Sequence, residues 1–520
     1  MKRFVKGVRL SNYCRFKDLS LDFNDRLNIL IGDNESGKSS IISAIDIVLS
    51  GSRNKVDALG LDKLFNAETV ETYLKSKKRY DELPILFIEV FLNDINRKEL
   101  EGKSHPSGQY CHGVYLLCQP RDDLSKEIKD ILDKGDNNFP FEYYSVNFKT
   151  FADQSYTGYS RFLRHLVIDN SKISNDYATK AYINTVYQAF VDGAERNNHL
   201  NKYRSYKEKY TISELANINA RVEDYAFAVK SNFKNNLETD LTITENGIDI
   251  ENKGMGRQCF IRTEFALQKN GKELDVILLE EPENHLSHTN MHRLIQKIKD
   301  TDSRQVFLST HSNLISARLD LRKSFLLNSS SYDYLQLDKL DEDTAKFFMK
   351  ASDNNILEFI MSKKVILVEG DAEYILMNQL YLNLTSEGIE RSGIHIISVG
   401  GTSFKRYLSV AKLLKIKTAV IRDNDGNYEE NVSQSYKDYV SEIINVFSDK
   451  DDKVRTFEIG IFNENKNICN ELFAAKRRTL SVLEYMLSEK AECAFQLLEK
   501  KGDALLAPQY IKEALIWIRE

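Results

Sequence analysis

At the start of the chain, apolar and polar residues follow a pattern that predicts two strands, a buried strand, a loop and a helix. Residues 4–10 and 19–23 alternate between the two kinds of side chain, which is typical of strands with one buried face. The run 26–32 is almost continuously apolar and enters a glycine-bearing turn, and residues 38–51 have the spacing of an amphipathic helix. Two further strands are predicted at 84–92 and 113–120.

The pattern changes twice more along the chain. From about residue 120 to 240, charged, Tyr- and Asn-rich segments with helical spacing predict a mostly α-helical insertion, after which strand signals return. Alternating strands and helices start again at 364, which predicts a second α/β unit. We therefore divide this α/β chain into a first part at 1–120, the insertion at 121–240, a return to the first fold at 241–340, a polar connector at 341–363 and a second domain with C-terminal helices at 364–520.

Composition changes this picture little. A chain of 520 residues is too long for one core, and its 42% hydrophobic content is ordinary. The net charge of −5 does not by itself indicate nucleic-acid binding, which would need a local basic patch. The six cysteines form no CxxC pair, and neither a signal peptide nor a membrane-spanning run is visible. We expect a cytoplasmic protein without a membrane partner.

The segment GDNESGKS, residues 32–39, fits the phosphate-binding loop G-x-x-x-x-G-K-[ST]. It lies between a predicted strand and a predicted helix, where backbone N–H groups and the helix N-terminus can cradle phosphate oxygens, so a chance match is the weaker alternative. Lys38 would reach the β and γ phosphates of ATP, and Ser39 would ligate its Mg²⁺. The predicted nucleotide-binding residues of this loop are Gly32, Asn34, Gly37, Lys38, Ser39 and Ser40.

Two later strands end in residues that such a loop requires. VILLEEPENHL, residues 276–286, places Glu280 where a carboxylate would help to hold the metal ion and Glu281 where one would orient or activate water. RQVFLSTHS, residues 304–312, ends in His311, which would sense the γ-phosphate.

This order of motifs resembles the head of the ABC-type ATPases. Glu280 stands where that family commonly has Asp, and the signature motif has a counterpart only in NKGMGRQ, residues 252–258, which lacks the serine. The resemblance implies that Gly254 and Gly256 lie at a dimer face and that the chain forms a homodimer or a higher homo-oligomer.

Three histidines after the acidic strand, His285, His288 and His292, offer an alternative zinc site, because the last two share a helix face. A polar helix face at the subunit contact is the favoured interpretation.

Carboxylates also gather in the second α/β unit. VILVEGDAEY, residues 365–374, is a buried strand that runs into Glu369 and Glu373, and AVIRDNDG, residues 419–426, ends in Asp423 and Asp425. The last two flank a single Asn, so in an extended segment they would point to the same side. Acids this close repel one another unless they bind metal or protons, and oxygen ligands select Mg²⁺ or Mn²⁺. Two such ions would support phosphodiester cleavage.

With the glycine turn SVGGTSF at 398–404, this arrangement resembles the Toprim fold, and strand-end acids of an ordinary Rossmann-like domain are the alternative. An ABC-like ATPase with a helical insertion followed by a Toprim domain resembles the OLD (overcoming lysogenization defect) endonucleases over nearly the whole chain. The resemblance implies that Glu369, Glu373, Asp423 and Asp425 form the nuclease site. It also implies that Lys490, which precedes the segment PQYI, contacts the scissile phosphate, and that Glu458 assists a second metal ion.

The family resemblance further implies a metal-dependent DNA endonuclease coupled to an ATPase, in prokaryotic defence against phage. Retron-like or Gabija-like systems are examples, some with a reverse transcriptase and its RNA–DNA product as partner. Basic stretches at 405–417, 75–79 and 474–478 are predicted phosphate contacts, with solvated helix faces as the alternative, and no base-reading module is visible.

Three other functions stay open. An SMC-like ATPase that bridges DNA would carry a long heptad coiled coil, which the 120–240 region lacks. A DNA-repair or primase-like Toprim protein is a second possibility, although a primase would need a zinc module. A regulatory ATPase with an inactive Toprim domain is the third, and the intact acids argue against it.

Overall fold

The computed structural model describes most of the chain as two compact units. The described residues are 2–133, 138–158, 160, 162–170, 176–191, 193–232, 236–267, 274–301, 303–329, 333–351, 355–401, 403–474 and 480–520. The first unit comprises Met1–His311 and Lys323–Tyr334, and the second comprises Ser312–Arg322 and Leu335–Glu520. Within the described ranges, no helix is both long enough and apolar enough to cross a membrane.

An antiparallel sheet opens the first unit. Its strands run in the order β2-β1-β4-β6-β5, with β7 also paired to β6. Alternating apolar residues of β1 and β4 are fully buried, as a strand with one core-facing side requires. The bounds are β1 (Val5–Tyr13), β2 (Phe16–Asp22), β4 (Leu86–Leu92), β5 (Glu101–Gly102), β6 (Cys111–Pro120) and β7 (Tyr144–Thr150).

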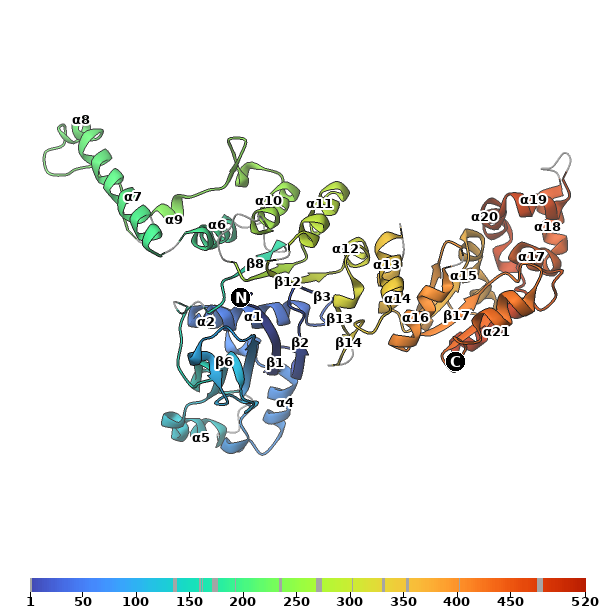
Figure 1. Cartoon of the computed structure of the whole chain (residues 1–520), viewed down its shortest axis with the longest axis horizontal. Helices are drawn as coiled ribbons and strands as arrows, with labels where there is room; N and C mark the ends of the chain where they lie inside the picture. The colour runs from blue at the N-terminus through green and yellow to red at the C-terminus, as the bar shows by residue number, and fades with distance from the viewer. Residues whose placement is uncertain are drawn as a thin grey trace. The chain divides into compact units, whose positions relative to one another are not determined.

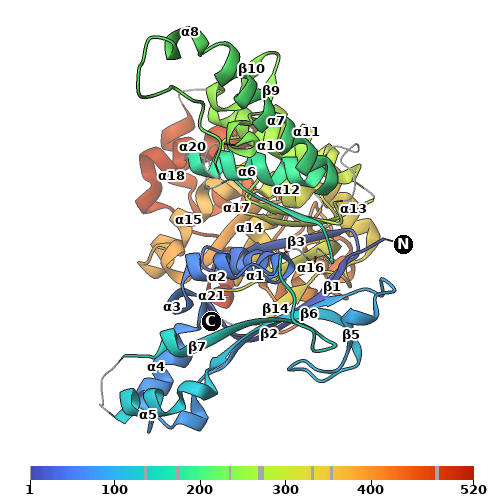
Figure 2. The ribbon, with the colours of Figure 1, turned by 90° about the vertical axis from the view of Figure 1, so that its left-hand side faces the viewer.

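A parallel sheet forms the second layer of this unit, with neighbouring strands in the order β13-β3-β12-β11-β8. The strand that leads into the phosphate-binding loop, β3, therefore lies beside the strand that ends in His311. Helix α1 contacts strands of both sheets and fills the space between them (Figures 1 and 2). The bounds are β3 (Leu27–Gly32), α1 (Lys38–Ser50), β8 (His165–Asp169), β11 (Val276–Glu280), β12 (Gln305–Thr310) and β13 (Ser324–Leu327).

The predicted helical insertion at 121–240 contains strands as well as helices. β7 pairs with β6 of the antiparallel sheet, and β8 forms the edge of the parallel sheet next to β11, so the expectation of helices is wrong for these segments. Short apolar runs do not distinguish strand from helix, and here pairing with distant strands decides. Its helices are α5 (Ser125–Asp133), α6 (Asp176–Phe190), α7 (Gly193–Ser213), α8 (Ala216–Asn219) and α9 (Leu237–Asp240). Helix α7 projects from the sheets (Figure 1).

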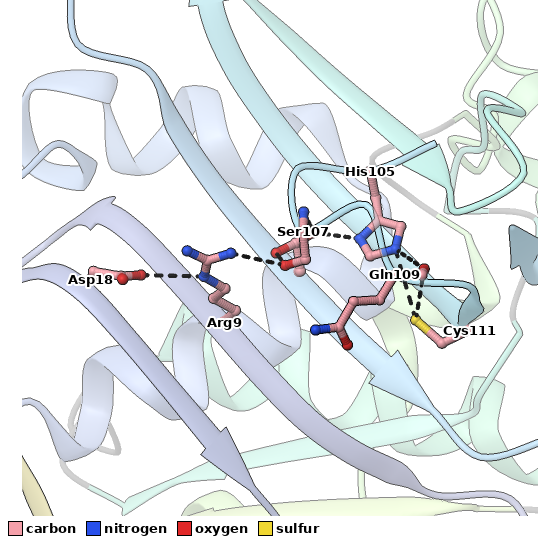
Figure 3. Close-up of polar contacts among 7 residues, drawn as sticks. Arg9, Asp18, His105, Ser107, Gln109 and Cys111 are labelled. Carbon is pink, nitrogen blue, oxygen red and sulfur yellow. Dashed lines mark hydrogen bonds and ion pairs between the residues drawn. The ribbon is translucent and has the colours of Figure 1, made fainter. Parts of the chain in front are cut away.

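A buried polar network holds the loop between β5 and β6 against the antiparallel sheet. The Glu89 carboxylate accepts hydrogen bonds from the Ser107 backbone N–H at 2.9 Å and from His105 Nδ1 at 2.5 Å. Ser107 Oγ also accepts a hydrogen bond from Arg9 Nη1 at 3.0 Å (Figure 3). The imidazole of His105 stacks on the Phe151 ring. Because Glu89 is fully buried, these donors replace the water it loses on folding.

The second unit contains a four-stranded parallel sheet in the order β16-β15-β17-β18. Its strands are β15 (Lys364–Val368), β16 (Ile394–Ser398), β17 (Lys417–Ile421) and β18 (Ile444–Phe447). Parallel strands end at the same edge of a sheet, which is where open α/β folds place their sites. The helices of this unit include α13 (Glu342–Lys350), α14 (Ile356–Met361), α15 (Asp371–Thr385), α16 (Phe404–Leu414), α17 (Phe457–Glu464), α20 (Lys490–Lys501) and α21 (Gln509–Arg519).

The other helices and the short hairpin complete the two units. They are α2 (Arg53–Leu59), α3 (Leu61–Leu64), α4 (Ala67–Lys75), β9 (Thr244–Glu245), β10 (Ile248–Asp249), α10 (Met255–Leu267), α11 (His288–Lys299), α12 (Asn313–Arg318), β14 (Tyr334–Gln336), α18 (Lys466–Phe473) and α19 (Val482–Ser488).

Candidate functional site

The phosphate-binding loop lines a cavity of about 200 Å³ at the carboxyl edge of the parallel sheet. Three segments far apart in the sequence meet there, because β3, β11 and β12 are neighbours and all end at this edge. The lining residues are Arg15, Asn34, Glu35, Ser36, Gly37, Lys38, Ser39, Ser40, Glu281 and His311. The structure thus brings most of the predicted nucleotide-binding residues together.

Lys38 is held inside this loop. Its ammonium donates hydrogen bonds to the carbonyl oxygens of Gly32 and Asp33, each at 2.8 Å. Burial lowers the pKa of Lys38 to about 8, although the carboxylates of Glu281 and Asp33 act in the opposite direction. Gly37, in this loop, has a φ of +96°, and a Cβ there would lie 2.3 Å from the Phe16 ring, so only glycine fits.

Glu281 faces the same cavity from the end of β11. Asn284 Nδ2 donates to its Oε2 at 2.9 Å, and His311 Nε2 lies 3.7 Å from its Oε1. The neighbouring Glu283 accepts hydrogen bonds from the Thr310 hydroxyl at 2.6 Å and from the His311 backbone N–H at 2.8 Å. These contacts fix the end of β12, so that His311 and Glu281 are oriented together.

Sequence reasoning missed two residues of this site. Glu283 stands two positions after Glu281, and its signal was the third acid of the EEPE segment at 280–283. Arg15 lines the cavity from the β1–β2 turn and donates to the carbonyl oxygens of Glu35 and Ser329. No local motif marks Arg15, because only the stacking of the two sheets brings it to the loop.

Glu280 and the glycine motif lie elsewhere. Glu280 lines a different cavity, which it shares with Asp169, its register partner on β8. Gly256 packs inside the unit, because a Cβ there would lie 2.2 Å from the His285 carbonyl oxygen. A Cβ at Gly254 would meet no atom within 4 Å in the part of the chain that the structure describes. The dimer contact of these two glycines stays a prediction.

In the second unit, acids from four elements converge at the carboxyl edge of the sheet. Glu369 follows β15, Glu373 lies in the first turn of α15, Asp423 follows β17 and Glu458 lies in α17. Glu373, Asp423 and Glu458 are 6%, 9% and 4% exposed. Asp423 Oδ1 accepts a hydrogen bond from the Phe457 backbone N–H at 2.8 Å, which ties the strand end to α17.

Burial and mutual repulsion dominate the electrostatics of this cluster. Burial, with a smaller contribution from the carboxylates of Glu373 and Glu369, raises the pKa of Asp423 to about 8. Burial also raises the pKa of Glu373 to about 7, with Glu458 and Glu369 contributing. Lys490, at the start of α20, lies 3.1 Å from Glu458 and supplies a positive charge to the group. The cluster therefore favours protons or cations at neutral pH.

Asp425 differs from the sequence expectation of an extended segment. Its φ is +52°, which is not extended backbone, and its side chain is 57% exposed. The side chains of Asp425 and the buried Asp423 therefore do not share one side of an extended segment. The buried Asn424 explains the turn, because its Nδ2 donates to the Asp449 carbonyl oxygen at 2.9 Å and its Oδ1 accepts from the Gly426 N–H at 2.8 Å. Asp425 instead lies 3.6 Å from Arg422.

The donor chemistry of the cluster fits a hard divalent cation. Among the described residues, no three His, Cys, Asp or Glu side chains are already spaced to hold one ion, and the three-histidine zinc alternative stays a prediction. The carboxylates supply only oxygen donors, and Mg²⁺ commonly takes few protein carboxylates and keeps several of its waters. Burial first and repulsion between the carboxylates second raise their pKa values, and a bound cation would offset the cost of the charged forms.

The basic stretch 405–417 is divided by the fold. Lys405 and Arg406 lie at the start of α16, beside the carboxyl edge of the sheet, whereas Lys417 starts β17 and therefore lies at the opposite end of that strand from Asp423. Lys75 and Arg79, of the stretch 75–79, form surface ion pairs with Glu71 and Asp81. Residues 475–478 of the third stretch lie outside the described residues.

Comparison with known proteins agrees with these two units. Residues 4–315 match the model of the AAA ATPase domain family, and residues 360–425 match the TOPRIM domain of overcoming lysogenization defect protein-like proteins. The C-terminal region of the OLD protein of Xanthomonas campestris pv. campestris aligns with 31% of this chain and 94% of that chain, at 24% identity and a TM-score of 0.22.

Three curated proteins illustrate the range of similarity. The OLD nuclease of Thermus scotoductus is 22% identical over 81% of this chain and 82% of its own length. The endonuclease GajA of Bacillus cereus is 27% identical over 31% of this chain and 28% of its own length. The DNA replication and repair protein RecF of Alkaliphilus oremlandii is 31% identical over 20% of this chain, and the matched part is 27% of that protein. The chain belongs to the AAA ATPase domain family, and its ATPase domain is followed by an OLD-like TOPRIM domain, in the order that the sequence predicted.

Proposed function

We propose that this protein is a metal-dependent DNA endonuclease whose cleavage is controlled by ATP in its ATPase unit. The observation that carries the proposal is the convergence of Glu369, Glu373, Asp423 and Glu458, with Lys490, at the carboxyl edge of the TOPRIM sheet. Buried acids that raise each other's pKa are costly for stability, and such costs are typical of functional sites.

Each residue has a role in the proposed chemistry. Glu369, Glu373, Asp423 and Asp425 would hold one or two Mg²⁺ or Mn²⁺ ions, with Glu458 in support. When bound, such ions lower the pKa of water and stabilise the oxygen that leaves in phosphodiester cleavage. Lys490 would contact the scissile phosphate, and its pairing with Glu458 keeps it oriented before substrate arrives.

The proposed role of the ATPase unit follows from its cavity. Lys38 and the loop N–H groups would bind the phosphates of ATP, while Ser39 and Glu280 would assist the metal ion. Glu281 would orient water, and His311, 3.7 Å from it, would respond to the γ-phosphate. We extend the proposal to a cytoplasmic homo-oligomer that acts in anti-phage defence, with a reverse transcriptase and its RNA–DNA product as one type of partner.

A plasmid cleavage assay with Mg²⁺ or Mn²⁺, with and without ATP, tests the proposal. Asp423→Asn and Glu369→Gln should each abolish cleavage and leave ATP binding unchanged. Asp371→Asn is the matched control, because Asp371 lies in the same helical turn as Glu373 but is exposed. If both site variants cleave like the parent, the nuclease assignment fails. The SMC-like or repair ATPase without nuclease activity then becomes the better interpretation.

A further inference from the structure

A groove of about 1240 Å³ lies in the second unit beside the carboxylate cluster. It extends along α13 and the N-terminal end of α16, and its lining includes Phe347, Ser398, Gly400, Ser403, Lys405 and Tyr439. We call it the α13–α16 groove. Its volume is larger than that of the nucleotide cavity, about 200 Å³, so it has room for an extended ligand.

The α13–α16 groove opens next to the proposed metal site. Ser398 pairs in register with Val368, the residue that precedes Glu369. The Gly401 N–H donates a hydrogen bond to the Glu369 carbonyl oxygen at 3.1 Å. A ligand that occupies the Ser398–Gly400 end of the groove therefore lies beside the first acid of the cluster.

The groove presents aromatic side chains on a rigid base. Phe347 is half-buried, and its ring centroid lies 5.4 Å from that of the buried Phe348. Phe348 contacts Tyr407 at 5.0 Å, and Tyr407 contacts Phe359 at 5.1 Å, so a series of edge-to-face rings supports Phe347 from the core. Tyr439 adds a second half-buried ring from the segment between β17 and β18.

Cations and an open backbone accompany these rings. The lining contains Lys405 and Arg406 against a single carboxylate, Asp341, which lies 3.6 Å from Arg406. Lys405 is exposed, and its ammonium lies 5.4 Å from the centroid of the Tyr436 ring. Gly400 has a φ of +62°, and a Cβ there would meet no atom of the described residues within 4 Å, so a phosphate group can approach its backbone closely.

A line of contacts connects Lys405 to the acids. Tyr436, under Lys405, accepts a hydrogen bond from Arg422 Nη1 at 2.5 Å, and Arg422 Nη2 lies 3.6 Å from Asp425. Positive charge therefore continues from the groove to the edge of the metal site, along the route that a phosphate backbone would take.

We propose that the α13–α16 groove binds single-stranded nucleic acid and guides it to the carboxylate cluster. Phe347 and Tyr439 stack bases, while Lys405 and the Gly400 backbone contact phosphates. Rings and a cation in one groove are the features of single-strand binding, because bases inside a duplex are already stacked on each other and do not offer their faces. This inference rests on the proposed function only for the cleavage of the bound strand, and not for its binding.

The test is fluorescence anisotropy of a labelled oligothymidylate on the full-length chain, in EDTA so that nothing is cleaved. Phe347→Ala and Tyr439→Ala should each weaken binding by about fivefold or more, as expected for the loss of one stacked base. Lys405→Gln should make the slope of log affinity against log salt concentration less steep, by about the amount expected for the loss of one phosphate contact. Tyr374→Ala, on the exposed face of α15, is the aromatic control and should bind like the parent.

Retention of binding by Tyr439→Phe, which keeps the ring, separates stacking from loss of structure. Unchanged affinity in both alanine variants overturns the proposal, as does a labelled duplex that binds as tightly and responds to the same changes. If the alanine variants bind normally while Asp423→Asn abolishes plasmid cleavage, the groove assignment fails and the nuclease assignment stands. Weakened oligothymidylate binding in a chain that never cleaves supports the groove and rejects the nuclease.

Discussion

The Lys490 ammonium lies 3.1 Å from the carboxylate of Glu458, whose side chain is only 5% exposed. A buried carboxylate without a partner is costly, so this lysine stabilises the folded unit as well as serving the proposed chemistry.

Removal of that lysine should separate its two roles. Lys490→Met leaves Glu458 unpaired and should lower the free energy of unfolding by about 1–3 kcal/mol, measured by urea denaturation of the metal-free protein. The double variant Lys490→Met/Glu458→Gln should recover most of that loss but should not cleave plasmid. Cleavage by the single variant at the parent rate would contradict a role for Lys490 at the scissile phosphate.

The metal-free protein should lose stability as pH rises. The folded-state pKa of Asp423 is about 8, above its ordinary value of 3.8. The contribution of its protonated form to the free energy of unfolding is therefore fully present below about pH 4 and disappears as pH rises through 8. Asp423→Asn keeps the oxygen that accepts from Phe457 but has no charge. In EDTA it should exceed the parent in stability by more than about 1 kcal/mol at pH 9. Thermal denaturation at pH 5 and pH 9 measures the difference, and equal pH profiles would disprove the assignment.

Binding of ATP should take up protons near pH 8. The pKa of Lys38 is lowered to about 8 in the free loop, and a phosphate beside the ammonium would raise it again. Titration calorimetry in buffers of different ionisation enthalpy counts those protons. Lys38→Ala should bind ATP at least about tenfold more weakly, corresponding to the loss of one charge-assisted contact of about 1.4 kcal/mol or more. The exposed Lys75→Ala is its control, and unimpaired binding by Lys38→Ala would refute the nucleotide site.

Hydrolysis should depend on Glu281. Glu281→Gln keeps the hydrogen-bonding shape but cannot take up a proton, so ATP turnover should fall by about 100-fold while binding persists. Glu280→Gln is the matched comparison, because its side chain lines a different cavity. A larger loss of ATP turnover in Glu280→Gln than in Glu281→Gln would contradict the role proposed for Glu281 and would favour Glu280 as the carboxylate that activates water.

The elements near each motif could be predicted from the sequence because their causes are local. An apolar run before GDNESGKS predicts β3 and α1, and VILVEG and AVIRDND predict strands that end in acid. At 144–150 and 165–169 the structure has strands where the sequence predicts helices. The reason is that β7 and β8 are stabilised by pairing with strands from other parts of the chain. The extended arrangement expected for Asp425 failed because the Asn424 side chain closes a turn through residues near Asp449.

The sequence by itself determined which chemical groups the protein carries and in what order: a phosphate loop, paired glutamates and a histidine, then two acidic strand ends. Only the tertiary structure decided which of them share a volume. Parallel pairing of β3, β12 and β11 brings Lys38, Glu281 and His311 to one cavity and leaves Glu280 in another. Burial of Asp423 and Glu373 beside Glu458 follows from the packing of α17 and α15 against the second sheet, and it raises their pKa values. The order and spacing of residues along a chain decide which chemical groups are available. The strength of their electrostatic interactions depends on distance and dielectric environment, and these are set only when remote elements pack together.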